Sequence, residues 1–322
     1  MIRAVAITGA TGFIGRHVAA ELAARGVAVT AIVRPGSRHK PPPGSTVVHA
    51  PLDAGALRGA FSGIDAVVHL AGVVSAVDAR TFAAVNTEGT RAVASAARDA
   101  GARLIHVSSL AAAGPAPASA PHREDDPSRP VTPYGVSKLD SERLVKATEG
   151  LRWIILRPGV VYGPTDRAVL PLFQAAERGV LPLVGRRDAA YTFIHVDDVV
   201  RTIVSAIERS DAAGTVFVGH PTPVSGRDLL DAIQAAIGRT ARVMAIPMPL
   251  TRVAAIVAHV AGRIAGTPMA LNLWRYAELE AEGFVCRVDR MRDELGVTAS
   301  VSLLDGMART AAWYREAGWL KR

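Results

Sequence analysis

Short apolar runs alternate along most of the chain with longer stretches that have helical spacing. The apolar runs are nearly continuous, and they lie at residues 5–7, 27–33, 46–50, 64–71, 103–107, 153–156 and 214–219. Longer stretches, among them the alanine-rich 81–100 and the segment 133–148, repeat apolar residues with the period of a helix. Buried strands that alternate with helices predict an α/β fold, in which helices cover both faces of a parallel sheet. Such sheets bind ligands at the carboxyl ends of their strands.

A glycine-rich turn follows the first apolar run directly. Gly9, Gly12 and Gly15 separate that run from a helical stretch that begins at Arg16. Glycines at this spacing let bare backbone N–H groups approach a pyrophosphate, and the helix N-terminus adds partial positive charge there. The next apolar run, 27–33, completes a β-α-β unit of the kind that binds dinucleotides. We therefore expect a Rossmann doubly wound sheet with a dinucleotide at its edge.

Composition excludes several classes of protein. The 322 residues are 49% hydrophobic, which indicates a well-packed globular protein with a substantial core. The single cysteine, Cys286, excludes a disulfide framework and a cysteine-based zinc site, and we expect no metal. Met1 leads almost directly into the first strand, and no apolar run reaches about 18 residues, so we expect neither a signal peptide nor a membrane-spanning helix. We therefore expect a cytoplasmic protein.

The net charge of +8 raises the question of nucleic acid binding. Basic residues are spread along the chain without a basic helix or interleaved aromatic residues, so the sequence favours a small anionic ligand over nucleic acid. Lysine is rare: the chain contains Lys40, Lys138, Lys146 and Lys321, and its other basic residues are arginines. This scarcity makes the position of Lys138 informative.

The end of the second apolar run bears on which dinucleotide is bound. Dinucleotide-binding folds place a carboxylate about 20 residues past the glycines, where it holds the adenosine ribose. Here Arg34 follows Val33, Ser37 and Arg38 come next, and no carboxylate is among them. A guanidinium suits the 2′-phosphate of NADP, so we expect NADP(H), with NAD as the alternative. The competing interpretation of Arg34 is an ordinary solvated arginine in a loop.

Tyr134 and Lys138 lie four residues apart in the helical stretch 133–148, so they share one face of the predicted helix. A phenol with its ordinary pKa near 10 is a weak acid–base catalyst at neutral pH. We expect the nearby ammonium to lower the pKa of Tyr134. A serine hydroxyl at the end of the run 103–107 can bond a substrate oxygen while tyrosine passes the proton, as hydride transfer requires.

These motifs together resemble one family, the extended short-chain dehydrogenases/reductases of the NAD-dependent epimerase/dehydratase superfamily, and the resemblance covers essentially the whole chain. The shared motifs are Thr8-Gly-Ala-Thr-Gly-Phe-Ile-Gly15, Asp53, His69-Leu-Ala-Gly72, Asn86, Ser108-Ser109, Tyr134-x-x-x-Lys138, Leu156-Arg-Pro-Gly-Val-Val-Tyr-Gly163 and Phe193-Ile-His-Val-Asp-Asp198. The closing Trp313–Trp319 segment is similar to the sterol-dehydrogenase-like branch.

The resemblance implies a catalytic triad of Ser109, Tyr134 and Lys138. Ser109 is preferred to Ser108 because the family's catalytic hydroxyl usually stands five residues before the glycine at Gly114. Implied cofactor contacts, besides Tyr134 and Lys138, are Thr8, Gly9, Thr11, Gly12, Phe13, Ile14 and Gly15 at the pyrophosphate, Leu52 and Asp53 at the adenine, Leu70, Ala71 and Gly72 along the adenosine ribose and diphosphate, and Pro158 and Val161 near the nicotinamide. Asn86 either orients the site near Lys138 or satisfies buried backbone groups.

Departures from the family pattern narrow the substrate. Sugar dehydratases of the family carry Asp-Glu directly after the catalytic hydroxyl, where this chain has Leu110-Ala111. Sugar-nucleotide epimerases often have a tyrosine at the position of Ala113 and an asparagine in the segment of Gly159-Val160. The space near the reacting centre is therefore expected to be small and apolar, which suits a hydrophobic ketone or alcohol.

The resemblance also divides the chain into two domains. Residues 1–161 and 192–220 would form the dinucleotide-binding Rossmann domain, and 162–191 and 221–322 a smaller α/β substrate-binding domain. Ser225 is expected to cap a helix. Within the second domain, 249–268 repeats apolar residues at helical spacing, with Arg252, His259 and Arg263 on another side. We expect a core-packing helix there; the alternative is a lid or a peripheral membrane contact that admits a lipid-like substrate.

The sequence therefore predicts an oxidoreductase that transfers hydride between NADP(H) and a ketone/secondary alcohol pair, with a steroid-like or long-chain substrate. The first alternative is a sugar-nucleotide epimerase with the same triad, and the second is a non-catalytic protein that senses NADP. Members of the family commonly form homodimers through two helices per subunit, so the resemblance implies a homodimer as well.

Overall fold

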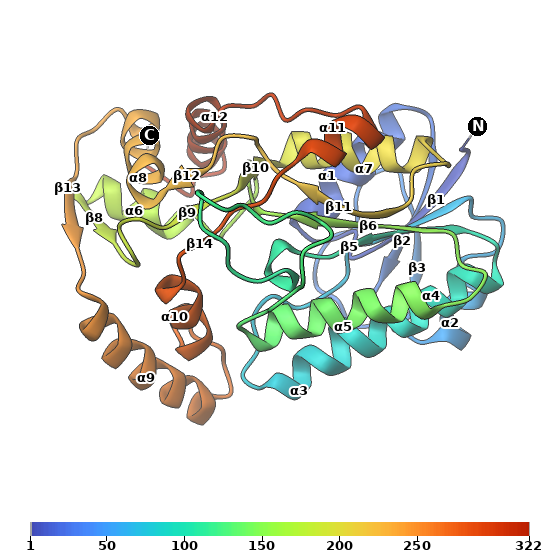
Figure 1. Ribbon diagram of the computed structural model, residues 1–322. Coiled ribbons are helices and arrows are strands. Elements are labelled where there is room, and N and C mark those ends of the chain that lie inside the picture. Colours follow the sequence, from blue (N-terminus) through green and yellow to red (C-terminus); the bar gives the residue numbers. More distant parts are fainter. Residues whose placement is uncertain (1, 322) are drawn as a thin grey trace.

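Seven parallel strands form the main sheet of the computed structural model, which describes residues 2–321 (Figure 1). The strands are β1 (Ala4–Thr8), β2 (Ala28–Val33), β3 (Thr46–His49), β4 (Ala66–His69), β5 (Arg103–Val107), β6 (Trp153–Pro158) and β11 (Gly214–Val218). They lie in the order β11-β6-β5-β4-β1-β2-β3. The direction of winding reverses between β1 and β4, and the carboxyl ends of these two strands therefore flank the ligand-binding crevice of such a sheet.

Helices cover both faces of this sheet, as the apolar strands require. On one face pack α1 (Phe13–Ala24), α7 (Val196–Glu208) and the short α11 (Asp289–Leu295). On the other face pack α2 (Ala54–Ala60), α4 (Gly89–Asp99) and α5 (Pro133–Ala147). The predicted helix over 81–100 consists of α3 (Ala79–Phe82), a π-helical turn (Ala83–Glu88) and α4. The predicted Rossmann doubly wound fold is confirmed.

Smaller elements gather beyond the carboxyl edge of the sheet, on the left of Figure 1. They comprise β7 (Val160–Tyr162) paired with β10 (Phe193–His195), β8 (Val180–Leu183) paired with β13 (Arg242–Ala245), and the sheet β12 (Val224–Ser225), β9 (Ala190–Tyr191) and β14 (Gly283–Phe284). The helices of this region are α6 (Leu170–Glu177), α8 (Gly226–Ile237), α9 (Met248–Ala265), α10 (Leu273–Glu280) and α12 (Leu303–Glu316).

A separate core cluster holds much of this second region together. Phe173, Ile233 and Tyr314 are fully buried in it, and Ser225 caps α8 as expected. Residues 289–299, by contrast, return to the first region, where Met291 packs in the same cluster as α1 and α7. The exact division into two domains stays a prediction.

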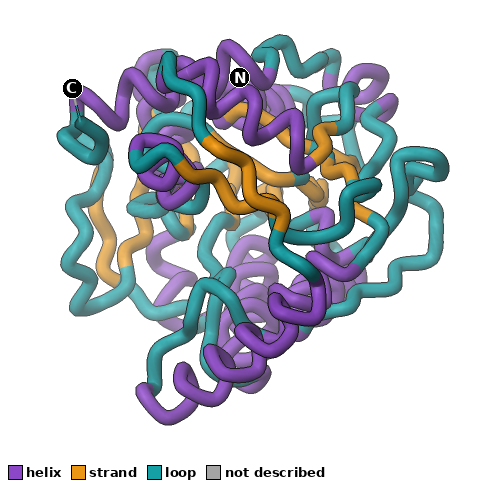
Figure 2. Tube along the Cα trace, turned by 90° about the vertical axis from the view of Figure 1, so that its left-hand side faces the viewer, coloured by secondary structure: helices purple, strands orange, loops and turns teal. Residues whose placement is uncertain are grey.

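The expectation that 249–268 packs into the core is wrong. Helix α9 lies at the margin of the molecule (Figures 1 and 2). Its large apolar side chains are exposed. Thr251, Ala255 and Gly262 are the buried residues of α9. Small side chains thus face the protein, while Val257 and Ile264 are 63% and 84% exposed. Among the described residues, no helix is both long enough and apolar enough to cross a bilayer.

A buried ion pair joins α5 to the sheet. The Arg157 guanidinium on β6 donates to both carboxylate oxygens of Glu142 on α5, at 2.8 and 2.6 Å, and both side chains are almost fully buried. Arg157 also lies over the ring of Phe217 on β11. Because each charge has lost its hydration, each depends on the other, and removal of one partner leaves the second uncompensated.

We predict that Glu142→Gln destabilises the protein by about 3 kcal/mol or more, because it leaves the buried Arg157 charge unpaired. Denaturant unfolding followed by circular dichroism measures the change. Asp140→Asn is the matched control: Asp140 lies half a turn away on α5 and pairs with Arg143 at the surface. The control should cost less than about 1 kcal/mol, as exposed pairs do. Equal losses of unfolding free energy in the two variants would contradict the conclusion that the buried Glu142–Arg157 pair stabilises the fold.

Candidate active site

The glycine turn brings the start of α1 close to two strands of the sheet. Gly9 has a positive φ of 74°, and a Cβ at this position would lie 2.7 Å from the backbone nitrogen of Ala71, which follows β4. A Cβ on Gly15 would overlap the Gly9 carbonyl. The Gly12 N–H donates to that same carbonyl at 2.9 Å. Side chains at Gly9 and Gly15 would therefore force the helix away from the sheet.

Helix α1 begins without a side-chain cap, because Gly12 occupies the N-cap position. Two other helices that border the sheet do have side-chain caps: Asp53 caps α2 and Thr132 caps α5. The N–H groups of the first turn of α1 are consequently left for a ligand, at the positive end of the helix. This arrangement fits a dinucleotide pyrophosphate bound by Gly12, Phe13 and Ile14.

A cavity of about 240 Å³ runs from this turn toward α5. Its lining includes eight of the predicted site residues, Ile14, Leu70, Gly72, Ser109, Tyr134, Lys138, Pro158 and Val161. The cavity thus follows the switch point between β1 and β4, where the fold predicts the cofactor. Thr8 is not in the lining: it is buried, and its hydroxyl lies 2.6 Å from Nδ1 of His69. Its contribution is to hold β1 against β4.

The adenosine end of the predicted site is open to solvent. Arg34 and Arg38 are exposed and Ser37 is half-buried in the turn after β2. Among residues 2–321, neither arginine forms an ion pair, so both guanidinium groups are free to meet an anion. Asp53, expected at the adenine, accepts a hydrogen bond from Ala56 N at 3.0 Å as the cap of α2.

Two adjacent serines at the end of β5 have different partners. The buried Ser108 hydroxyl donates to the Glu142 carboxylate at 2.5 Å. The half-buried Ser109 hydroxyl accepts from Ala111 N at 3.2 Å and keeps its proton free to donate. This geometry favours Ser109 as the group that meets a substrate oxygen.

Lys138 and Tyr134 lie on the face of α5 that borders the cavity. The Lys138 ammonium is buried, donates to the Val107 carbonyl at 2.8 Å, and has its pKa lowered by burial to about 8. Burial raises the pKa of the Tyr134 phenol, and the nearby Ser109 hydroxyl works in the opposite direction. The pKa of Tyr134 is thus raised in the protein alone and not lowered as expected, because loss of hydration outweighs the Ser109 hydrogen bond.

Asn86 satisfies buried backbone groups. Its side chain accepts from Val73 N at 2.8 Å, and its amide donates to Val73 O and to Ser137 Oγ, each at 3.0 Å. Ser137 lies on α5 next to Lys138. Asn86 thus ties the loop after β4 to α5 beside Lys138, so its contacts fit both of the roles that its sequence position left open.

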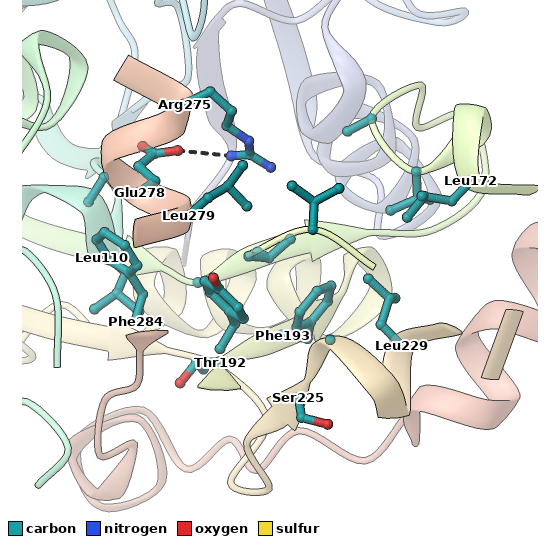
Figure 3. Close-up of a pocket in the computed structure, with 18 of the residues that line it drawn as sticks. Leu110, Leu172, Thr192, Phe193, Ser225, Leu229, Arg275, Glu278, Leu279 and Phe284 are labelled. Carbon is teal, nitrogen blue, oxygen red and sulfur yellow. Dashed lines mark hydrogen bonds and ion pairs between the residues drawn. The ribbon is translucent and has the colours of Figure 1, made fainter. Parts of the chain in front are cut away.

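A second, larger cavity of about 430 Å³ also borders Tyr134. Figure 3 shows much of its wall. Apolar side chains dominate its wall, among them Leu110, Val160, Leu172, Leu183, Phe193, Leu229, Leu279 and Phe284. Arg275 and Glu278 on α10 are the charged residues of the wall, and they pair with each other at 2.9 Å. The cavity therefore offers an apolar space with few fixed polar contacts.

Sequence reasoning missed most of this wall. Tyr191 comes from β9, Leu229 from α8 and Leu279 from α10, three segments separated by long stretches of chain. No local motif marks them, because they meet only after the second region has folded. The four residues that border both cavities are Ser109, Tyr134, Pro158 and Gly159, and the first three were predicted site residues.

Comparison with known proteins identifies the family. The model described as "NAD dependent epimerase/dehydratase family" matches residues 5–219. A ceramide reductase of Caulobacter vibrioides is 32% identical, over 99% of this chain and 96% of its own. Sterol demethylase protein B of Methylococcus capsulatus is 29% identical, over 98% and 99%. The solved structure of Thermus thermophilus UDP-glucose 4-epimerase in complex with NAD is 25% identical with a TM-score of 0.77, over 98% and 99%. The chain belongs to the NAD-dependent epimerase/dehydratase family and is an NAD(P)-dependent enzyme of the extended short-chain dehydrogenase/reductase type.

Proposed function

We propose that this enzyme reduces a hydrophobic ketone to a secondary alcohol with NADPH, or catalyses the reverse oxidation. The observation that carries the proposal is the position of Ser109 and Tyr134, which border both the cofactor cavity and the apolar cavity. A carbonyl group held between their two hydroxyls would lie at the junction of the two spaces. The nicotinamide would supply a hydride there.

The protein's own groups suit proton donation in the direction of reduction. Because burial raises the pKa of Tyr134, the phenol keeps its proton at neutral pH and can give it to the developing alkoxide. Ser109 can donate a second hydrogen bond to the same oxygen. Lys138, anchored on the Val107 carbonyl, adds positive charge on the cofactor side of the site.

The wall of the larger cavity supports an apolar substrate. A hydrocarbon skeleton bound against its aliphatic and aromatic side chains would leave few polar groups of the wall without a hydrogen-bond partner. The charged residues of the wall, Arg275 and Glu278, pair with each other. The likeness to a ceramide reductase and to a sterol demethylase protein also favours a steroid-like or long-chain substrate. Both names denote proteins that act on lipids.

NADP is proposed as the cofactor, with NAD as the alternative. The end of β2 offers exposed Arg34 and Arg38 and no carboxylate, an arrangement that attracts the 2′-phosphate and lacks the acceptor for a free ribose hydroxyl. We also propose that the cofactor contacts residues Thr11 through Gly15 at its pyrophosphate, and Leu52 and Asp53 at its adenine.

An epimerase that returns the hydride to the same substrate is the second candidate, favoured by the likeness to UDP-glucose 4-epimerase. Two positions weigh against it. Ala113 is buried, and a Cβ on Gly159 would overlap the Thr192 carbonyl, so the larger polar residues common in epimerases do not fit this backbone. A protein that binds NADP without turnover is the third candidate, and the intact Ser109, Tyr134 and Lys138 weigh against it.

The remaining proposals concern the location, the oligomeric state, the domain division and the partners of the enzyme. We propose a cytoplasmic homodimer, with 1–161 and 192–220 as the cofactor domain and 162–191 and 221–322 as the substrate domain. The substrate is a small molecule, and no nucleic acid is involved. We also propose peripheral membrane contact through 249–268.

Tyr134→Phe should abolish ketone reduction, by a factor of about 100 or more, because the proton donor is removed while the ring stays in place. NADPH affinity, measured by fluorescence titration, should change little. Net NADPH oxidation by the wild type distinguishes a reductase from an epimerase, which would isomerise its substrate without net oxidation. Undiminished turnover by the Phe variant would show that Tyr134 is not the acid.

Arg34→Ala should weaken NADPH binding by roughly tenfold to a hundredfold and leave NADH binding nearly unchanged, because only NADPH carries the 2′-phosphate. Isothermal titration with each cofactor measures both affinities. Arg227→Ala on α8, an exposed arginine paired with Asp231, is the matched control and should alter neither. An NADH preference that Arg34→Ala leaves untouched would remove the argument for NADP.

A further inference from the structure

Exposed apolar side chains are concentrated in one short part of the molecule. Between residues 244 and 273 the large hydrophobic side chains that reach solvent are Met244, Ile246, Leu250, Val253, Ile256, Val257, Val260, Ile264, Met269 and Leu273. The rest of the described chain exposes seven such side chains in scattered places. A cluster of this density on a protein surface marks an interaction site. We name it the α9 surface, after the helix that supplies most of it.

Helix α9 is oriented opposite to an ordinary surface helix. Its small residues Thr251, Ala255 and Gly262 face the protein, and Ala258 flanks them. The outward side carries valine, leucine and isoleucine along the full length of the helix. An ordinary amphipathic helix buries its large apolar residues against the core. The outward face of α9 is therefore available to a partner.

Helix α9 and the segments that flank it carry positive charge, and the first carboxylates after them lie on α10, where Glu278 pairs with Arg275 and Glu280 accepts from the Tyr276 hydroxyl. Residues 232–277 contain five arginines and no aspartate or glutamate. Arg252 and Arg263 lie on one flank of the outward face of α9, both exposed, and neither forms an ion pair among residues 2–321. An apolar strip flanked by unpaired cations complements a surface that is apolar within and anionic outside.

Helix α9 packs against a helix, α10, that lines the substrate cavity. Helix α9 packs on α10, where the rings of His259 and Trp274 are 5.5 Å apart. Trp274 contacts Phe82, and Phe82 contacts Tyr134, with ring centres 5.6 and 6.0 Å apart. Arg275, Glu278 and Leu279 of α10 line the cavity (Figure 3). A body that covers α9 thus lies beside the wall of the cavity.

We propose that the α9 surface docks on an anionic lipid bilayer, so that α9 lies in the plane of the interface and a lipid-like ketone passes from the bilayer to the cavity beside α10. Charge complementarity favours an anionic bilayer over a second copy of the chain, because a second copy would bring its own arginines against Arg252 and Arg263. The part of the inference that concerns substrate entry rests on the proposed function; the docking surface itself does not.

Sedimentation with vesicles tests the docking surface without turnover. The full chain should sediment with vesicles of phosphatidylglycerol and phosphatidylcholine, much less with phosphatidylcholine alone, and less as salt is raised. Val257→Asp/Ile264→Asp should reduce binding by at least about tenfold, because both side chains would enter the apolar layer. Leu304→Asp, at a leucine on α12 that is 60% exposed, is the control and should bind normally.

A second pair of variants tests the charge. Arg252→Gln/Arg263→Gln should weaken binding roughly fivefold for each arginine removed. Wild-type protein that stays in the supernatant, or binding that survives Val257→Asp/Ile264→Asp, would overturn the proposal. So would a dimer in sedimentation velocity that these two substitutions dissociate while no vesicle binding is seen, because a second copy would then cover the surface.

Activity separates the docking surface from the proposed function. Val257→Asp/Ile264→Asp should reduce a short water-soluble ketone at the wild-type rate and lose most activity on a long-chain ketone embedded in vesicles. Vesicle binding without reduction of any ketone would keep the docking surface and remove the proposed function. Equal activity of the variant and the wild type on the embedded ketone would overturn the role of α9 in substrate entry.

Discussion

Close contact between the backbones of Gly9, Gly15 and Ala71 is the constraint on which the site depends. Because no side chain separates them, α1 starts directly against the carboxyl ends of β1 and β4, with its first N–H groups uncapped. The same edge receives the ends of β5 and β6, which carry Ser109 and Pro158. Residues from four strands and α5 therefore meet along one cavity.

Buried polar contacts then fix the position of α5 on that edge. Glu142 binds Arg157 on β6 and the Ser108 hydroxyl after β5, so the helix is tied to two strands at once. Lys138 is bound to the Val107 carbonyl one turn away. The consequence is a division of roles between neighbouring serines: Ser108 belongs to the structural network, and Ser109 remains free for a substrate oxygen.

Much of the fold and of the cofactor cavity could be predicted from the sequence, because both are encoded by local patterns. Apolar runs of strand length, the glycine turn and the Tyr134–Lys138 spacing each carry their own physical meaning. Quantities set by tertiary structure could not be predicted in this way. Burial reversed the expected pKa shift of Tyr134, and helical periodicity in α9 could not show that its small residues, Ala255 and Gly262, face the protein. The walls of the apolar cavity come from distant segments without a shared motif.

In the proposed reaction, Ser109 and Tyr134 hold a ketone where it receives hydride from the cofactor. Transfer of deuterium tests this most directly. NADPH labelled with deuterium at the reactive position of the nicotinamide is incubated with the enzyme and a long-chain ketone, and the product is analysed by mass spectrometry and NMR. If the enzyme transfers hydride from NADPH to the ketone, we expect one deuterium on the carbinol carbon for each NADPH oxidised. An isomerised product without label and without net oxidation, or no product at all, would contradict it.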